Sequence, residues 1–85
     1  MKPTKSEITA IINANLREHF TSPNFVFIEE VNAELRKIFS SLNFHPLAAN
    51  QIIVRLELSA AGNMRGHKLD VILQIIEEAM SDMTC

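Results

Sequence analysis

The most regular pattern in the chain is the stretch IEEVNAELRKIFSSL at residues 28–42. Its main apolar residues are spaced three, four, three and four apart, as in a short heptad seam. These seam residues are Ile28, Val31, Leu35, Ile38 and Leu42. Acidic residues come early in the stretch and basic residues late, the order that a helix dipole favours. The pattern predicts an amphipathic helix. Ser22 followed by Pro23 suits its N-cap and first position, so we expect the helix over residues 23–42.

The residues before this stretch predict a second helix. Thr4-Lys5-Ser6-Glu7 matches a capping box, in which the Thr4 hydroxyl accepts from the Glu7 amide while the Glu7 carboxylate accepts from the Thr4 amide. Apolar residues then recur at helical spacing from Ile8 to Phe20. We therefore expect a helix over residues 4–20.

The segment that Pro46 opens carries two apolar stripes. One consists of Ile52, Ile53, Leu56 and Ala60, and the other of Leu47, Val54, Leu58 and Ala61. A helix that is apolar on two sides is buried on two sides, so we expect a central helix over residues 46–61. Residues 52–59 also alternate in the manner of a strand, and 25–31 is the plausible partner for it. That alternative stays open at this point.

A last helix is expected over residues 65–82, with Gly62 as the left-handed cap of the preceding one. Leu69, Ile72 and Ile76 recur on one face of it. Glu77, Glu78 and Asp82 stand late in this helix, against its dipole, so we expect its end to fray. The chain is thus predicted to be all-α, with residues 1–85 forming one small bundle of about four helices.

The amount of apolar side chain favours a homodimer. Hydrophobic residues make up 47% of 85 residues, although a domain of this size hides only about 60–65% of its surface. A twofold dimer would cover the remainder. The predicted interface is the heptad seam of the second helix together with Ile72 and Ile76 of the last.

The net charge and the cysteine content indicate in which compartment the protein is located and which partners it does not attract. The net charge of −2 creates no field that would concentrate DNA or an anionic membrane around the whole molecule. A lone cysteine, Cys85, suits a reducing compartment. The apolar runs are far shorter than the ~20 residues that span a bilayer, and the first residues lack a signal-peptide pattern. We expect a soluble, cytoplasmic protein that does not bind membranes.

Enzymatic and metal chemistry are not predicted. His19, His45 and His67 lack the paired ligand spacings of metal sites, and no serine or cysteine stands in a nucleophile motif. The adjacent glutamates also do not form a catalytic pair of carboxylates, because neighbouring residues diverge by about 100° around a helix. We therefore expect no catalytic residues, no metal and no cofactor. We also expect His19 and His67 to be solvated residues at helix ends, with acid sensing near pH 6.5 as the alternative.

One local basic cluster, Arg65, His67 and Lys68, is a candidate nucleic-acid contact because it stands at an expected helix start. DNA binding usually neutralises several phosphates, which favours an ordinary exposed connection here. A helix-turn-helix over residues 51–76 fits poorly, since Lys68 would stand where an apolar residue must face the core.

A set of short motifs follows in order over residues 19–83: His19-Phe20-Thr21-Ser22, Glu29-Glu30, Asn50, Ile52-Ile53, Leu56-Glu57, Asp70-Val71-Ile72 and Ser81-Asp82-Met83. This order of features resembles the AriR/YmgB family, small enterobacterial regulators of biofilm formation and acid resistance described as connectors for two-component signalling. The resemblance implies an all-α homodimer that modulates stress, biofilm and acid-resistance genes through phosphorelay components, with non-specific DNA binding.

The leading hypothesis is therefore a dimeric connector or regulator that acts by contact with a regulatory or signalling protein. One alternative is a small DNA-binding modulator of low specificity. Another is a phage- or plasmid-encoded inhibitor that covers a host protein.

Overall fold

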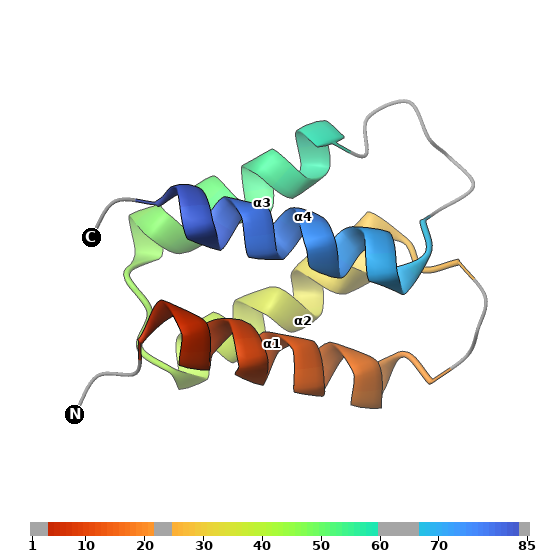
Figure 1. Ribbon diagram of the computed structural model, residues 1–85, viewed down its shortest axis with the longest axis horizontal. Helices are drawn as coiled ribbons and strands as arrows, with labels where there is room; N and C mark the ends of the chain where they lie inside the picture. Colours follow the sequence, from red (N-terminus) through yellow and green to blue (C-terminus); the bar gives the residue numbers. More distant parts are fainter. Residues whose placement is uncertain (1–3, 22–24, 60–66, 84–85) are drawn as a thin grey trace.

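The computed structural model describes residues 4–21, 25–59 and 67–83, and within them the chain forms four helices and no strand. They are α1 (Lys5–His19), α2 (Ile28–Ser41), α3 (Pro46–Ser59) and α4 (Leu69–Asp82). Consecutive helices run in opposite directions and pack against one another, and α4 returns to pack against α1 (Figure 1). The fold is an up-and-down four-helix bundle, which confirms the all-α prediction.

The predicted capping box begins α1. The amide of Glu7 donates to Thr4 Oγ1 at 3.1 Å, and the amide of Thr4 donates to Glu7 Oε1 at 3.2 Å. Both bonds satisfy amides that a helix start leaves without partners. The helix ends at His19, within one residue of the expected end.

The predicted start of α2 at residue 23 was wrong, because the helix begins at Ile28. Phe25–Phe27 precedes it, a short run of β-prone residues, and here Val26 forms an isolated antiparallel bridge with His67. The amide of Val26 donates to the His67 carbonyl at 2.8 Å, and the His67 amide donates back at 2.9 Å. The expected caps Ser22 and Pro23 lie outside the described residues.

The turn between α2 and α3 has the geometry of a Schellman motif. Asn43 adopts the left-handed conformation with φ of 53°. Its amide donates to the Ser40 carbonyl, and the amide of Phe44 donates to the Phe39 carbonyl at 2.9 Å. The rings of Phe39 and Phe44 stack with centroids 4.7 Å apart, which is the apolar contact that accompanies this motif. The turn therefore closes α2 and directs the chain into α3.

The third segment forms the expected helix, but the expectation that this helix is buried on two sides was wrong. Residues 52–59 lie in α3, so the strand alternative is excluded. The helix is buried on one side only: Ile52, Ile53 and Leu56 are buried, whereas Leu47, Val54 and Leu58 of the second stripe are exposed. The reason is the ring of four helices, in which α3 packs only against α2 and α4. Residues 60 and 61, at the expected end of the helix, lie outside the described part.

The last helix begins at Leu69, four residues later than predicted, because His67 belongs to the bridge and Lys68 is the N-cap. Gly62, the expected cap of the preceding helix, lies outside the described residues. The expected fraying of α4 is opposed by two contacts. Asp82 Oδ2 lies 2.6 Å from Arg55 Nη1 of α3, and the carbonyl of Met83 accepts a hydrogen bond from Lys5 Nζ of α1.

All four helices contribute to one continuous core. Its most completely buried side chains are Ile12, Leu16, Val31, Leu35, Ile52, Leu56, Ile72, Ile76 and Met80. None of the helices in the described ranges has the length and apolar character needed to cross a membrane.

Candidate functional site

The residues of the predicted dimer interface belong to this core. Val31, Leu35, Ile72 and Ile76 are at most 1% exposed, and Ile38 is also buried. Ile28 and Leu42 are half-buried and pack against the same core. The ring of four helices within one chain already covers the seam, so a second copy would have to contact another face.

The predicted basic cluster is only partly described. Arg65 lies outside the described residues, while His67 and Lys68 precede α4 instead of forming its first turn. Lys68 is exposed. The Nε2 atom of His67 is buried and has no hydrogen-bond partner among the described residues, so the expectation of a solvated helix-end histidine was wrong for His67.

The second stripe of α3 forms an exposed line of side chains along the bundle. Leu47 is 69% exposed, Val54 42% and Leu58 71%. The exposed residue Gln51 completes the line, so that successive members are spaced four, three and four apart. We call Leu47, Gln51, Val54 and Leu58 the α3 outer face. Contiguous exposed apolar side chains are common at interaction sites, so the α3 outer face is a candidate interaction surface.

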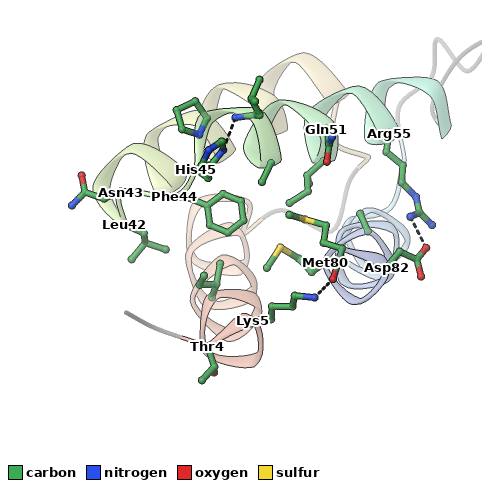
Figure 2. A pocket seen from close by; sticks show the side chains of 17 residues that line it. Thr4, Lys5, Leu42, Asn43, Phe44, His45, Gln51, Arg55, Met80 and Asp82 are labelled. Carbon is green, nitrogen blue, oxygen red and sulfur yellow. Dashed lines mark hydrogen bonds and ion pairs between the residues drawn. The ribbon is translucent and has the colours of Figure 1, made fainter. Parts of the chain in front are cut away.

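A groove opens at the end of the bundle where the N-terminus of α1, the α2–α3 turn and the C-terminus of α4 meet (Figure 2). Its volume is about 1470 Å³. Its apolar lining comes from three helices and the turn. The lining comprises Ile8 of α1, Leu42 and Phe44 of the turn, Leu47, Ala48 and Ile52 of α3, Ala79 and Met80 of α4, and Met83. We call this the end groove. The core side chains Ile8, Ile52 and Met80 reach its wall.

The polar side chains that line the end groove are Thr4, Lys5, Asn43, His45, Gln51, Arg55 and Asp82. Lys5 of α1, His45 of the turn and Arg55 of α3 line it, and Asp82 is the one acidic side chain in the lining of the described residues. The Nδ1 atom of His45 accepts a hydrogen bond from the amide of Leu47 at 3.2 Å, so His45 satisfies an amide at the start of α3 (Figure 2).

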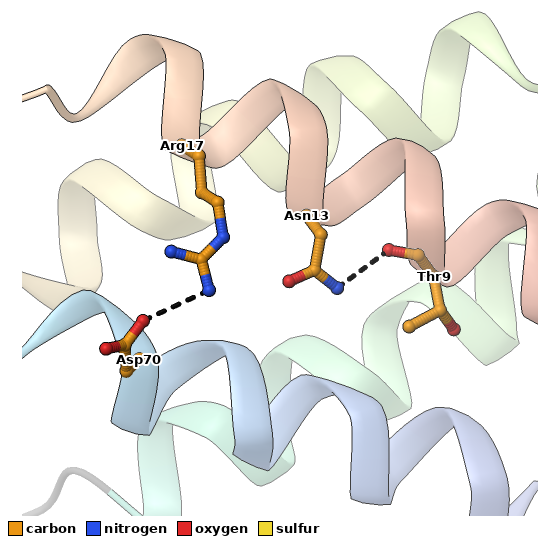
Figure 3. Close-up of polar contacts among 4 residues, drawn as sticks. All are labelled: Thr9, Asn13, Arg17 and Asp70. Carbon is orange, nitrogen blue, oxygen red and sulfur yellow. Dashed lines mark hydrogen bonds and ion pairs between the residues drawn. The ribbon is translucent and has the colours of Figure 1, made fainter.

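An ion pair of the same kind lies towards the opposite end of the bundle. Arg17 Nη2 of α1 lies 3.1 Å from Asp70 Oδ1 of α4, with both side chains largely exposed (Figure 3). Between this pair and Thr9, the side chain of Asn13 turns back along its own helix, where Nδ2 donates to the Thr9 carbonyl at 3.0 Å. Exposed pairs such as Arg17–Asp70 contribute at most about 1 kcal/mol.

The histidines lie at different places in the described structure. His19 Nε2 lies 3.5 Å from Glu34 Oε1 of α2, His45 caps α3, and His67 belongs to the bridge with Val26. Among the described residues no three side chains of the histidine, cysteine, aspartate or glutamate type converge as metal ligands would.

Neither surface was predicted from the sequence. The second stripe of α3 was recognised but assigned to the core, and its four-three-four spacing, with Gln51 in the line, was the signal of a separate face. The end groove has no counterpart in the sequence, because it joins residues as distant as Thr4 and Met83.

No model of a known protein family matches the chain, and neither do the curated proteins or the solved structures compared with it.

Proposed function

We propose that this chain is a non-enzymatic regulatory protein that works as a homodimer and acts by protein–protein contact. The observation that carries the proposal is the α3 outer face, where Leu47 and Leu58 are each about seven-tenths exposed. Burying a leucine side chain fully is worth roughly 1.5–3 kcal/mol, so leaving two exposed on one helix forgoes a substantial stabilisation.

The spacing of this face suits a second copy of the same chain. Two α3 helices that pack antiparallel about a twofold axis place Leu47 of one copy opposite Leu58 of the other, and Gln51 opposite Val54. The four-three-four spacing is that of a helix–helix seam. The line contains no charged residue, so self-pairing brings no like charges together.

Sedimentation of the purified chain at low micromolar concentration tests the dimer. We expect wild type to sediment as a dimer and Leu58→Glu to give a folded monomer, since Leu58 contributes little to the core of the single chain. Val71→Glu is the matched control, because Val71 is an exposed apolar residue of α4, 46% exposed, outside the α3 outer face. A dimer also unfolds at a temperature that rises with protein concentration.

A monomeric wild type would reject the dimer. Dissociation by Val71→Glu and not by Leu58→Glu would retain a dimer but assign it to a different face. Far-UV circular dichroism of each variant separates loss of association from loss of folding.

The cellular role that we propose is modulation of two-component signalling in biofilm formation and acid resistance, which rests on the AriR/YmgB resemblance alone. Complementation of a deletion strain of the native host tests it. Wild type should restore biofilm mass and survival in acid, whereas Leu58→Glu should not and Val71→Glu should. An unchanged phenotype on deletion would reject this role and leave the dimer untouched.

A further inference from the structure

The end groove is a different surface from the α3 outer face, although Leu47 and Gln51 border both. Small-molecule sites usually measure about 300–1,000 Å³, and this groove is larger, at about 1470 Å³. Its wall combines side chains from three helices and a turn. A groove of this size and apolar character fits a segment of polypeptide better than a metabolite, as in recognition modes in which a helix lies in a groove.

The apolar wall contains two methionines, Met80 and Met83. Figure 2 shows Met80 on the side of the groove that faces the ring of Phe44. Methionine side chains are unbranched and polarisable, so they adjust to the shape of an apolar partner. Ile8 of α1 and Ile52 of α3 extend this wall. An occupant must therefore present a continuous apolar face.

The charged side chains at the rim of the end groove indicate which charged groups a bound segment should carry. Lys5 and Arg55 are the two cationic side chains in the described lining, and Asp82, which pairs with Arg55, is the one anionic side chain there. Lys5 directs one donor to the carbonyl of Met83, and an ammonium group has three. The guanidinium of Arg55 likewise has more donors than its contact with Asp82 uses. The rim therefore favours carboxylates on the incoming segment.

We propose that the end groove binds an amphipathic helical segment of a second protein, apolar on one face and acidic along the edges of that face. A helix from a second copy of this chain does not meet the description, because the apolar faces of its acidic helices α2 and α4 are buried in their own bundle. The inference goes beyond the dimer and survives its failure, since it needs only one chain.

Selection from a display library of random peptides of about 16 residues, some four helical turns, tests the proposal. We expect enriched peptides to carry apolar residues at helical spacing flanked by Asp or Glu. On an isotope-labelled sample, the bound peptide should shift the amide resonances of Ile8, Ile52 and Met83. Ala48→Trp, which fills the groove from α3, should abolish the binding.

Two matched variants test the role of charge. Arg55→Gln should weaken the selected peptide by about two- to fivefold and flatten its salt dependence, as expected for loss of one exposed ion pair. Arg17→Gln removes the equivalent arginine of an Arg–Asp pair outside the groove and should change neither. Arg55→Lys keeps the positive charge and should preserve the salt dependence of binding. A purely structural role of Arg55 does not predict that result.

Several results would overturn the proposal. They are enrichment of basic peptides, enrichment without helical spacing, absence of enriched peptides, and resonance shifts confined to Val54 and Leu58. Saturable binding of dodecanoate at the groove resonances without peptide binding would identify it as a fatty-acid site. If Ala48→Trp fails to fold, the resonance shifts of the wild-type chain still decide the site.

Discussion

Val26 and His67 exchange two main-chain hydrogen bonds, of 2.8 and 2.9 Å, across forty-one residues of sequence. The bridge joins the segment before α2 to the segment before α4, at the end of the bundle remote from the end groove (Figure 1). Val26 is also 5% exposed, so its side chain belongs to the core. The contact explains why α2 and α4 both begin later than their sequences suggest.

Hydrogen exchange should reveal this bridge. We expect the amides of Val26 and His67 to exchange slowly, because each donates to the other residue's carbonyl. The amides of Phe25 and Phe27 have no such partner among the described residues and should exchange faster. The exchange is measured by nuclear magnetic resonance in deuterated buffer. Equal exchange rates at all four amides would contradict the bridge.

The left-handed conformation of Asn43 should affect the free energy of unfolding of variants at this position. Asn43→Ala is expected to destabilise the chain by about 1 kcal/mol, since a Cβ without a local hydrogen-bonding group is disfavoured at φ of 53°. Asn43→Gly should be neutral or mildly stabilising, because glycine adopts this conformation readily. Urea denaturation measures both free energies of unfolding. A glycine variant less stable than the alanine variant would contradict the Schellman geometry.

Substitution by alanine should destabilise the single chain strongly at Leu35 and hardly at all at Leu58. Leu35 is fully buried, so Leu35→Ala is expected to cost about 2–5 kcal/mol of stability and to reduce helix content at moderate urea. Leu58→Ala should change the stability of the monomer by less than about 0.5 kcal/mol when measured in dilute solution. At higher concentration Leu58→Ala should weaken association. Similar losses in dilute solution would show that Leu58 is buried within one chain.

Asn32 is a buried polar residue of α2, 5% exposed, whose Oδ1 atom has no hydrogen-bond partner among the described residues. Asn32→Leu should therefore stabilise the chain by about 1–2 kcal/mol, because it removes an unsatisfied acceptor and keeps the volume similar. Asn15→Leu on the exposed side of α1 is the control and should have little effect. A destabilised Asn32→Leu variant, measured by thermal unfolding, would show that Asn32 makes a compensating contact.

The sequence by itself determined the helical elements and several of their ends. The capping box at Thr4 and the break at 43–46 depend on local hydrogen bonds and backbone preferences, which are written in a few adjacent residues. The heptad spacing from Ile28 to Leu42 likewise predicted the buried face of α2, because period alone decides which side chains share a face.

Only the tertiary structure decided which of two apolar faces is covered. Both stripes of α3 are hydrophobic, and the inner one is buried because α2 and α4 lie on that side. The bridge of Val26 with His67 was equally inaccessible to local reasoning, since each residue's partner lies in another segment. The end groove arises from the meeting of helix ends far apart in the chain. Burial and cavities depend on neighbours in space, whereas propensity and spacing describe only neighbours in sequence.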